Sequence, residues 1–592
     1  MVFTNNKNYF KFLTLLLLIT AVGCSTVKNY PANKPFIFNT NVSVTGNISK
    51  DEKKRLTNDL ENYWDDSLKV PKLQNKIFWY SIKQPPAFDT NNISRSIKYM
   101  NSYLNSQGYY YATFKDSIAT YDTVKDQIRT SVFINVNVGK NITLDSVSYI
   151  LLDSNMQRLA LKNIDKSFLK PGNPYTKQDI SAELDRLTNI FRQNGYFGLS
   201  RDDIYAEVDT TDHELLKLSI NIFDQAKLLA EAASNRRENP KWKVVIKQKE
   251  IKDSSKTNIY HIARTFYYPE EKLTDIPDSL ILHKNDYQEY ASKSGNGFMR
   301  YKEGKFSYRP LREHTFLKHD SLYNENLFIQ SINTLEQIGA WQQVDAKAIV
   351  RNRDSLDLYF FLIPALKQNF SVDQEVSRNT GDIASSSLLG ISSNFTYRNR
   401  NVWKNAIQSV TSLRLGTELG FDSTNKLVPQ IFQIGLSHSY IFPKIIQPFT
   451  QWRYLNKLDN KRTIVSVAGS YTNRKDIYTL RQFTASWGYE WSKMNKSNTP
   501  WIWNFKPLNL ELYKVDTLSG FQQLLVNNPF LQKSFRDGNV LGTTLSATRT
   551  FSGNKDAHNI HILSFYFEES GTVASLFTKN KSGQIFDYLK LQ

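Results

Sequence analysis

The segment Ala406–Phe421 reads AIQSVTSLRLGTELGF. Its odd-numbered positions from Ile407 to Phe421 are mainly apolar, whereas the even-numbered positions include Arg414 and Glu418. Strict alternation of this kind predicts a β-strand whose two faces meet different surroundings. Strands of soluble proteins average about 5 to 6 residues, whereas a strand that crosses a membrane in a barrel needs about 9 to 11. The length of this segment therefore favours a membrane-spanning strand.

The same alternation recurs downstream, in Phe432–Phe442 and in Phe483–Trp491. Aromatic residues gather at the ends of these segments, where the aromatic girdle of a membrane barrel would lie. For these strands alone, a large soluble β-sandwich with a polar outer face is the alternative. The N-terminal sequence favours the membrane.

The composition limits the class of protein. A chain of 592 residues is too long for one domain, so two to five units are expected. A hydrophobic content of 40% and a mean hydropathy of −0.47 exclude a helical membrane protein but not a β-barrel. The net charge of +19 fits nucleic acid, acidic lipid headgroups or a basic soluble surface. Because no single cluster of Lys and Arg dominates, we expect no nucleic-acid partner.

Residues 1–23 have the features of a signal peptide. Lys7 and Lys11 precede the apolar run Phe12–Val22, which is too short to span a membrane as a mature helix. Export across the inner membrane is therefore expected, and with it a location outside the cytoplasm.

Cys24 follows this leader and is the only cysteine of the chain, which excludes an intramolecular disulfide. The sequence Ala21-Val22-Gly23-Cys24 resembles the bacterial lipobox, although most lipoboxes have Leu where this chain has Ala21. The resemblance implies that Cys24 is lipidated and that residues 24–34 form a tether. An ordinary signal peptide and an unmodified thiol are the alternatives.

A module appears three times between residues 35 and 365. Each copy has an amphipathic helix, then a glycine-aromatic turn, then two strands. The turns contain Gly108 and Tyr109 in the first copy, Gly195 and Tyr196 in the second, and Gly339 and Trp341 in the third. The longer gap before the third turn predicts an insertion between residues 250 and 320. The expected modules are 35–140, 141–225 and 226–365, followed by the alternating strands of 366–592.

A helix, a glycine-tyrosine turn and two strands resemble the POTRA domain. Three such copies before long alternating strands are similar to the outer-membrane assembly-factor superfamily that includes BamA and TamA. The segment Asn399–Ala406, with Arg400, Asn401 and Trp403, resembles the first barrel hairpin of that family. Asn405 stands where the family has glycine, and we expect it to adopt the left-handed backbone conformation.

Two features depart from the family. The chain contains no Arg-Gly dipeptide, whereas the family carries one in a late barrel loop. About nine strands can be placed after Leu366, which is fewer than the family's barrel has. These departures predict either a fragment of a longer protein or a barrel completed by another chain, and we expect the fragment.

No motif for catalysis or metal binding is recognisable. HExxH, GxSxG and P-loop sequences are absent. The histidines are scattered; His558 and His561 would point to opposite faces of a strand, and His314 and His319 are expected on the surface. We therefore expect no enzyme activity, no cofactor and no metal site.

The predicted fold class is a set of α+β POTRA-like repeats followed by an antiparallel transmembrane β-barrel, incomplete in this chain. The family resemblance implies a bacterial outer-membrane protein with periplasmic modules that inserts or translocates unfolded polypeptide. Lipid and accessory periplasmic proteins or lipoproteins are the other implied partners. The alternative is a passive channel or receptor whose modules only dock partners.

Strand addition is the expected mechanism, because an unpaired sheet edge binds an unfolded strand through main-chain hydrogen bonds. The edges proposed to receive the client polypeptide are Ser131–Val138, Leu215–Phe223 and Ser355–Ile363. By resemblance, Asn369–Arg378 is the first barrel strand and would act as an openable gate. Its candidate gate residues are Phe370, Val372, Gln374 and Val376.

Overall fold

The structure is a computed structural model that divides into two compact units, Met1–Arg192 with Gly198–Thr257 and Gln193–Phe197 with Asn258–Gln592. It describes residues 25–28, 34–69, 72–76, 79–83, 85–122, 127–209, 240–250, 253–273, 287–379, 388–421, 426–447, 459–493, 499–521, 537–552, 560–570 and 588–591. Among these residues, no helix is both long enough and apolar enough to cross a membrane.

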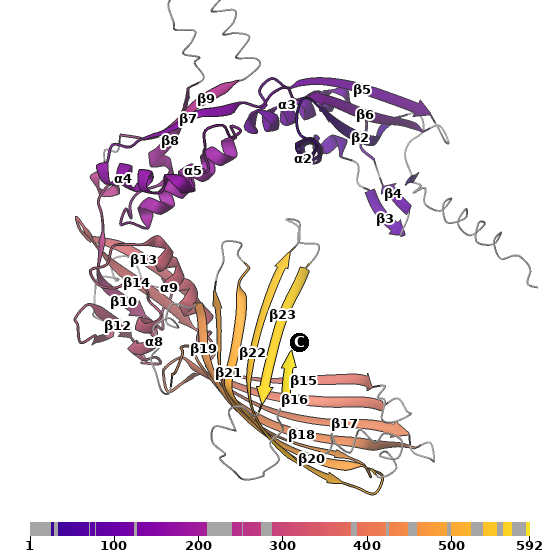
Figure 1. Cartoon of the computed structure of the whole chain (residues 1–592), viewed down its shortest axis with the longest axis vertical. Helices are drawn as coiled ribbons and strands as arrows, with labels where there is room; N and C mark the ends of the chain where they lie inside the picture. The colour runs from indigo at the N-terminus through magenta and orange to yellow at the C-terminus, as the bar shows by residue number, and fades with distance from the viewer. Residues whose placement is uncertain are drawn as a thin grey trace, which may run out of the picture. The chain divides into compact units, whose positions relative to one another are not determined.

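The first module has the order strand, helix, helix, strand, strand (Figure 1). Its strands form a sheet of order β2-β6-β5, in which β2 pairs parallel to the central β6 and β5 pairs antiparallel to it. Leu56, Leu60, Met100 and Leu104 fill the space between the helices and this sheet. The elements are β2 (Pro35–Thr45), α2 (Lys50–Leu60), α3 (Thr90–Ser106), β5 (Thr113–Asp122) and β6 (Ile128–Asn137).

A small accessory sheet is formed by one strand that comes before β2 and two strands that lie between α2 and α3. It has the order β1-β4-β3, and β1 lies within the segment expected to be a tether. Two short 3-10 helices, η1 (Glu61–Tyr63) and η2 (Asp66–Leu68), follow α2. The strands of the accessory sheet are β1 (Ser25–Lys28), β3 (Lys72–Lys76) and β4 (Trp79–Lys83).

The second module repeats the connectivity, with a sheet of order β7-β9-β8. Because β9 is the central strand of this sheet, the module continues past residue 225, where the sequence analysis placed its end. The expected strand Leu215–Phe223 lies outside the described residues. The elements are β7 (Thr143–Ile150), α4 (Ser154–Lys162), η3 (Ile164–Lys166), α5 (Lys177–Arg192), η4 (Arg201–Asp203), β8 (Ile204–Asp209) and β9 (Lys241–Gln248), with η6 (Ser254–Lys256) after them.

The third module has the same connectivity and an additional hairpin. Its sheet has the order β11-β12-β10-β14-β13, so the hairpin β11-β12 extends the sheet beyond β10. This hairpin lies within the range where an insertion was expected. The elements are β10 (His261–Tyr268), β11 (Gln288–Ala291), β12 (Gly297–Tyr301), α8 (Tyr308–Glu313), α9 (Glu325–Gln337), β13 (Trp341–Asn352) and β14 (Ser355–Pro364).

The first strand of every module carries a register shift at the same place, between Ile37 and Asn39, Leu144 and Ser146, and Ile262 and Arg264. In each module, the segment before the second helix also makes a hydrogen bond to the start of the first strand. Its backbone N–H groups donate from Phe88 to Pro35, from Tyr175 to Ile142 and from Tyr323 to Tyr260, at 3.1, 2.8 and 2.8 Å. The three modules are therefore repeats at the level of individual backbone bonds.

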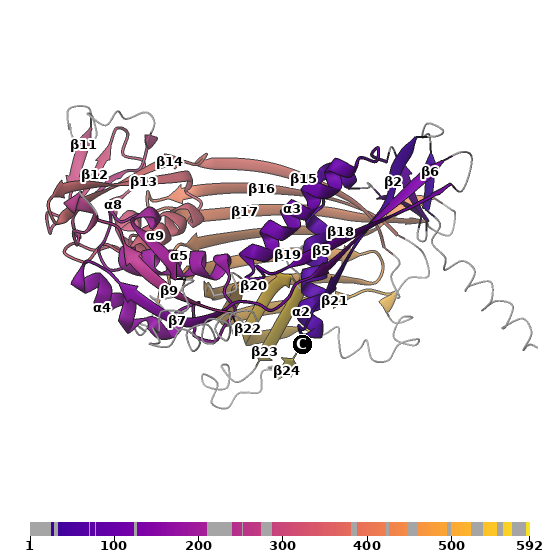
Figure 2. The ribbon, with the colours of Figure 1, turned by 90° about the horizontal axis from the view of Figure 1, so that it is seen from above.

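Ten antiparallel strands follow in one sheet, in sequence order from β15 to β24 (Figures 1 and 2). Pairing between β15 and β24 is not present among the described strands, so they are the two ends of the order. The expected fold class, α+β modules followed by a long antiparallel sheet, is confirmed. The strands are β15 (Gln368–Asn379), β16 (Leu388–Val402), β17 (Ile407–Phe421), β18 (Leu427–Phe442), β19 (Asp459–Arg474), β20 (Tyr478–Lys493), β21 (Trp501–Thr517), β22 (Gly538–Ser552), β23 (Ile560–Ser570) and β24 (Tyr588–Leu591).

Candidate functional site

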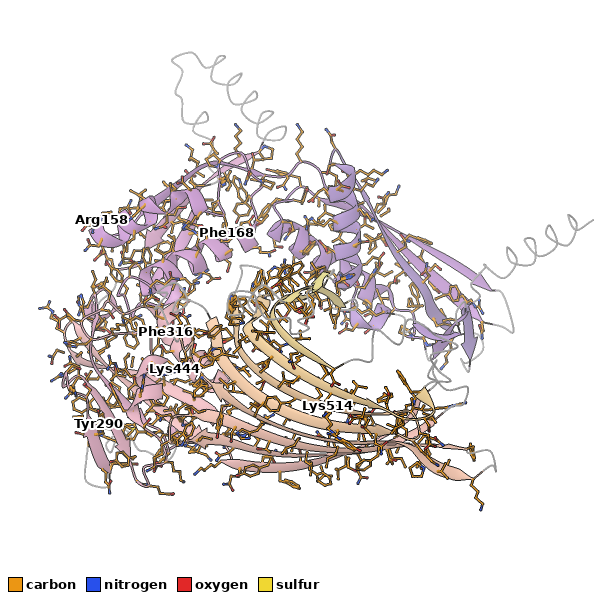
Figure 3. The ribbon with its side chains drawn as sticks, turned by 60° about the horizontal axis from the view of Figure 1, so that its bottom comes forward. Arg158, Phe168, Tyr290, Phe316, Lys444 and Lys514 are labelled. Atoms are coloured by element: carbon orange, nitrogen blue, oxygen red, sulfur yellow. The ribbon has the colours of Figure 1, made fainter. Side chains whose placement is uncertain are left out.

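One face of the ten-stranded sheet is apolar and exposed. Leu413 of β17 lies between Phe395 of β16 and Leu436 of β18, and residues directly opposite each other in paired strands share a face. The adjacent position Arg414 points to the other face and lies 4.0 Å from Glu375, with both side chains exposed. In Figure 3 side chains project from both faces of the sheet. The alternation in Ala406–Phe421 therefore separates two chemically different surfaces.

The apolar face continues across the neighbouring strands. Many large apolar side chains lie on this face and are exposed. Contiguous exposed apolar surface is uncommon in soluble monomers and marks membrane or protein interfaces. They include Phe370, Val372, Val376, Leu389, Ile391, Phe432, Ile434, Leu436, Val467, Phe483, Leu508, Leu563 and Phe565.

The candidate gate strand is β15, the first strand of the sheet. Phe370, Val372, Gln374 and Val376 pair with Tyr397, Phe395, Ser393 and Ile391 of β16, so all four lie on the apolar face. Phe370 and Val376 are 63% and 71% exposed, and Phe370 stacks on Phe395 with ring centroids 6.5 Å apart. A role as a gate remains a prediction for these residues.

Aromatic side chains gather at the strand ends on the side of the sheet where β16 turns into β17. Trp403 stacks on Tyr440 with centroids 5.4 Å apart, and Trp491 lies parallel to Trp503 at 6.3 Å. Trp501 lies 6.3 Å from Trp503. The rings form a belt of the kind found where barrel strands meet the membrane surface.

The hairpin between β16 and β17 differs from the expectation for Asn405. Trp403, Lys404 and Ala406 have positive φ angles of 54°, 58° and 55°, and Asn405 is not among the residues in this conformation. The expectation that Asn405 replaces a left-handed glycine is therefore wrong. Its amide is used elsewhere: Nδ2 donates to Trp403 O at 2.9 Å and Oδ1 accepts from Ser307 Oγ at 2.6 Å. These bonds hold three neighbouring residues in a conformation that non-glycine residues rarely adopt.

This hairpin is bound to the third module. Ser307 N donates to Lys404 O at 2.7 Å, and Asn401 Nδ2 donates to Lys305 O at 2.8 Å. Ala406 is buried within the core cluster of the third module. Arg400, the remaining residue singled out in this hairpin, donates its backbone N–H to Lys367 O at 2.8 Å. The hairpin Asn399–Ala406 therefore fixes the third module to the sheet, and we call this contact the joint.

Asn401 makes the central bonds of this joint. Its Oδ1 also accepts from Ala406 N at 3.0 Å, and the side chain is buried. Because replacement by alanine leaves a carbonyl and an N–H unpaired, we expect Asn401→Ala to weaken the joint by about 2 kcal/mol or more. Hydrogen exchange in peptides covering 302–308 should accelerate. Asn326→Ala, at an exposed position of α9, should leave it unchanged; equal rates in both variants would contradict this assignment.

The glycine-aromatic turns have the expected backbone geometry. Gly108, Gly195 and Gly339 have φ angles of 85°, 101° and 74°. After α3, Tyr109 N donates to Leu104 O and Gly108 N to Asn105 O, which is the Schellman pattern of a helix end. The aromatic partners Tyr109, Tyr196 and Trp341 are all buried.

The turns also contact segments further along the chain. Gly108 O accepts from Ile142 N at 3.1 Å, and Gly195 O accepts from Tyr260 N at 2.9 Å. At the third turn, Gln408 Nε2 donates to Ile338 O at 2.6 Å, and a Cβ on Gly339 would come within 2.9 Å of that nitrogen. These glycines end a helix, and they also allow the contacting segment to approach the turn closely.

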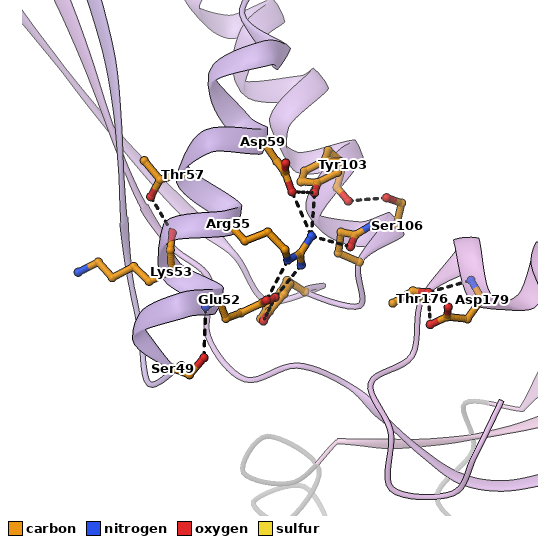
Figure 4. Close-up of polar contacts among 12 residues, drawn as sticks. Ser49, Glu52, Lys53, Arg55, Thr57, Asp59, Tyr103, Ser106, Thr176 and Asp179 are labelled. Carbon is orange, nitrogen blue, oxygen red and sulfur yellow. Dashed lines mark hydrogen bonds and ion pairs between the residues drawn. The ribbon is translucent and has the colours of Figure 1, made fainter. Parts of the chain in front are cut away.

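A polar network links Glu52, Arg55 and Asp59 (Figure 4) and extends to Tyr109. Glu52 accepts from Arg55 and from Tyr109 Oη, the latter at 3.1 Å, and Arg55 also donates to Asp59 at 3.0 Å. The hydrogen bond from Arg55 holds the pKa of Glu52 below its ordinary value, whereas burial raises the pKa of Tyr109 to about 12. The groups satisfy one another, so this network fixes the helices and offers no reactive group.

Two of the expected receiving edges are wrong. Ser131–Val138 is essentially β6, which lies between β2 and β5, and Ser355–Ile363 is β14, which lies between β10 and β13. The last strand of each module is central because it returns beside the first strand, in parallel, while also pairing with the strand before it. The third expected edge, Leu215–Phe223, lies outside the described residues.

His314 is buried, contrary to the expectation of a surface histidine, whereas His319 is exposed as expected. The Nδ1 atom of His314 lies 2.7 Å from Pro310 O. The Nε2 atom of His314 lies 2.6 Å from Pro443 O, beyond the end of β18. Lys444, labelled in Figure 3, lies 3.5 Å from Glu313 at the same place. His314 therefore joins the third module to the sheet.

Burial holds the pKa of His314 below its ordinary value, while the two carbonyl groups and Glu313 act in the opposite direction and Lys461 acts with burial. A histidine with a lowered pKa in the folded state binds fewer protons there than in the unfolded state. The contact that His314 makes between the third module and the sheet should therefore lose stability as the pH falls below 6.5, the ordinary pKa of histidine. The protection factors of amides around 310–316, which are exchange rates corrected for the intrinsic rate at each pH, should fall as the pH is lowered from about 7.5 to 5. His314→Gln should remove part of this pH dependence, and His319→Gln should not; an unchanged profile in His314→Gln would count against it.

Other predicted sites are not visible. Cys24 and residues 1–23 lie outside the described residues. The described part of the chain holds no group of three or more His, Cys, Asp or Glu side chains that could bind a metal ion.

No protein-family model and no curated protein matches this sequence. Solved structures are similar to it, at low identity. The POTRA3-5 fragment of Haemophilus influenzae BamA is 13% identical, with a TM-score of 0.25, and the match covers 57% of this chain and 100% of that one. For CdiB from Acinetobacter baumannii the identity is 11%, the TM-score 0.36, and the coverage 73% and 62%.

BamA from Haemophilus ducreyi, lacking POTRA domains 1-3, is 11% identical, with a TM-score of 0.30 and coverage of 74% of this chain and 88% of that one. The match to CdiB from Acinetobacter baumannii covers 62% of that chain, which is less than two thirds of its length. The similar solved structures also include POTRA1-3 of the periplasmic domain of Omp85 from Anabaena, which is 10% identical, with a TM-score of 0.16 and coverage of 56% of this chain and 96% of that one.

Proposed function

We propose that this protein lies in the bacterial outer membrane, binds unfolded polypeptide on its N-terminal modules by strand addition, and inserts it into the membrane or translocates it across. One observation carries this proposal: small sheets with unpaired edges precede a long antiparallel sheet that is apolar on one face and charged on the other. The modules would be periplasmic, and the lipid anchor at Cys24 is part of the same proposal.

The sheet supports a membrane location through its exposed apolar face. Burying apolar area is worth about 25 cal/mol per Å², so leaving this face in water would be unfavourable. Lipid removes that cost and leaves the face with Arg414 and Glu375 in contact with water. The basic net charge of the chain suits acidic lipid headgroups.

The modules support polypeptide binding through their sheet edges. An edge strand presents alternate N–H and C=O groups that an extended chain of almost any sequence can pair with. A barrel strand in its unfolded state is such a chain, because its side chains alternate and its backbone is unpaired. The similarity to BamA and CdiB structures is consistent with this role, and unfolded outer-membrane or secreted polypeptides are the proposed clients.

A fluorescent peptide with the sequence of β20, YTLRQFTASWGYEWSK, provides a direct test on the full-length protein in detergent or nanodiscs. We expect saturable binding that is lost when residues 35–365 are deleted. The same deletion should abolish insertion of a urea-unfolded barrel protein into vesicles that contain the full-length chain. Retention of ion conductance together with undiminished peptide binding after the deletion would instead indicate a passive channel.

A further inference from the structure

The second module carries a short surface segment in which large apolar side chains are exposed. The chain turns through α4 and η3 and then reaches Leu169, which is buried. Leu161, Ile164 and Phe168 are 49%, 43% and 52% exposed, although a globular domain usually buries such residues. Single exposed apolar residues are common on soluble proteins, whereas three within eight positions form a local cluster.

Basic residues alternate with these apolar residues. They recur every four positions, and all of them are exposed: Arg158, Lys162, Lys166 and Lys170. Asp165 is the only acidic residue between positions 158 and 170, so four positive charges and one negative charge give this stretch a net charge of +3. We call residues 158–170 the basic-apolar segment.

A buried ion pair fixes the backbone of this segment. Glu183 of α5 is completely buried and accepts two hydrogen bonds from Arg186, at 2.6 and 2.8 Å. The same carboxylate accepts from Phe168 N at 3.1 Å, and Arg186 also donates to Asn163 O at 3.1 Å. Both ends of the turn 163–168 are therefore tied to one ion pair.

The sheet holds the same turn through a tyrosine. Tyr149 of β7 donates to Glu183 at 2.8 Å, and its hydroxyl oxygen lies 2.9 Å from Ser167 Oγ. Ser167 Oγ in turn donates to Leu169 O at 3.1 Å. Taking an ion pair out of water is unfavourable unless hydrogen bonds satisfy both groups, and here they do. The turn that carries Ile164 and Phe168 is therefore a rigid part of the module.

We propose that the basic-apolar segment is a docking surface for an anionic phospholipid bilayer, which would hold the second module against the membrane. Apolar side chains mixed with Lys and Arg are typical of segments that lie at the boundary between lipid headgroups and acyl chains. The apolar side chains would enter this boundary, and the basic side chains would bind lipid phosphates. This inference rests on the membrane location in the proposed function and adds a second membrane contact to it.

Charge complementarity selects this occupant. A net charge of +3 over thirteen residues suits a surface of anionic headgroups. Three of the four basic residues are lysines, whose compact ammonium group binds a phosphate from many directions on a flexible stem. Lysines therefore suit a fluid surface on which headgroups move and exchange, whereas a fixed anionic partner favours the planar fork of arginine.

Photo-crosslinking to lipid tests this inference on the full-length protein in nanodiscs. p-Benzoylphenylalanine would replace Phe168 or, as the control, Tyr205 of β8, another exposed aromatic residue of the same module. Tyr205 lies opposite Lys247, which forms an ion pair with Glu207. With alkyne-tagged phosphatidylglycerol in the nanodisc, we expect lipid labelling from position 168 to exceed labelling from position 205 by about tenfold.

Charge reversal tests the role of the lysines. Lys162→Glu combined with Lys166→Glu should lower lipid labelling from position 168 by about tenfold or more. Lys53→Glu combined with Lys54→Glu makes the same change in net charge at exposed positions of α2 and should leave the labelling unchanged. Tagged phosphatidylcholine in place of phosphatidylglycerol should also give several-fold weaker labelling, because its headgroup has no net charge.

Equal labelling from positions 168 and 205 in protein that has inserted into the nanodisc would overturn this inference and leave the proposed function standing. Cross-linking from position 168 in whole cells that gives protein adducts and no lipid adduct would also overturn it, since the segment would then bind a protein. Failure of the full-length chain to insert into nanodiscs would contradict the membrane location, and with it both the inference and the proposed function.

Discussion

Replacing Leu436 with arginine is expected to destabilise the sheet in the membrane by about 2 to 4 kcal/mol, the cost of a basic side chain on the lipid face of a barrel near its midplane. Leu436 is 56% exposed and lies opposite Leu413, in the middle of the apolar face. A guanidinium at this position loses its hydration and finds no partner among leucine side chains. Urea titration of the protein refolded into lipid vesicles would measure the loss.

The neighbouring residue Ser437 provides the control. It lies opposite Ser412 on the other face of the same strand, so Ser437→Arg should change the unfolding free energy by less than about 1 kcal/mol. The comparison tests the direction of the side chain, since the two positions are adjacent in the strand and the introduced residue is the same. Equal effects of the two substitutions, or full solubility of the unmodified protein without detergent or lipid, would refute a membrane location for this sheet.

Gly108→Ala is expected to destabilise the first unit by about 3 kcal/mol or more. A Cβ at this position would lie 2.4 Å from Tyr175 O and 2.5 Å from Asn141 Oδ1, and the glycine has a φ of 85°. The left-handed conformation alone costs a non-glycine residue about 1 to 2 kcal/mol. The contact with a backbone oxygen adds the cost of moving the second module's chain away from Gly108.

Gly172→Ala separates these two costs. Gly172 has a φ of 83°, but apart from its two chain neighbours no described residue has an atom within 4 Å of the position that its Cβ would occupy. It should therefore show the conformational cost of about 1 to 2 kcal/mol without the collision. Hydrogen exchange in peptides from α3 and β7 would report both changes. If the two variants behaved alike, Gly108 would be needed only to end its helix.

Local features of the sequence predicted much of the fold. Alternation placed β17, β18 and β20, because a side chain's face in a strand depends only on whether its position is odd or even. The glycine-aromatic turns placed the ends of α3, α5 and α9, because a left-handed residue at a helix end favours glycine wherever the helix packs. The first strand and first helix of each module were missed. Lys50–Leu60 and Ser154–Lys162 have 11 and 9 residues, whereas α3, α5 and α9 have 17, 16 and 13, so fewer helical turns repeat their apolar positions.

The errors concern contacts between distant residues. Asn405 was expected to be left-handed, but its amide bonds to Ser307, almost one hundred positions earlier, and its neighbours take the strained conformation instead. The expected edges β6 and β14 became central strands through parallel pairing with β2 and β10. No local pattern in the sequence carries this information, because an edge strand and a central strand can show the same alternation.

The sequence by itself determined several of the long strands, which of their side chains share a face, and where three helices end. The tertiary structure alone decided which edges remain open, that the hairpin Asn399–Ala406 binds the third module, and that His314 lies between two backbone carbonyls. The physical reason is the distance along the sequence over which each property is determined. Periodicity and backbone conformation are set within a few consecutive residues, whereas the pairing order of strands and the burial of a side chain depend on segments brought together only when the chain folds.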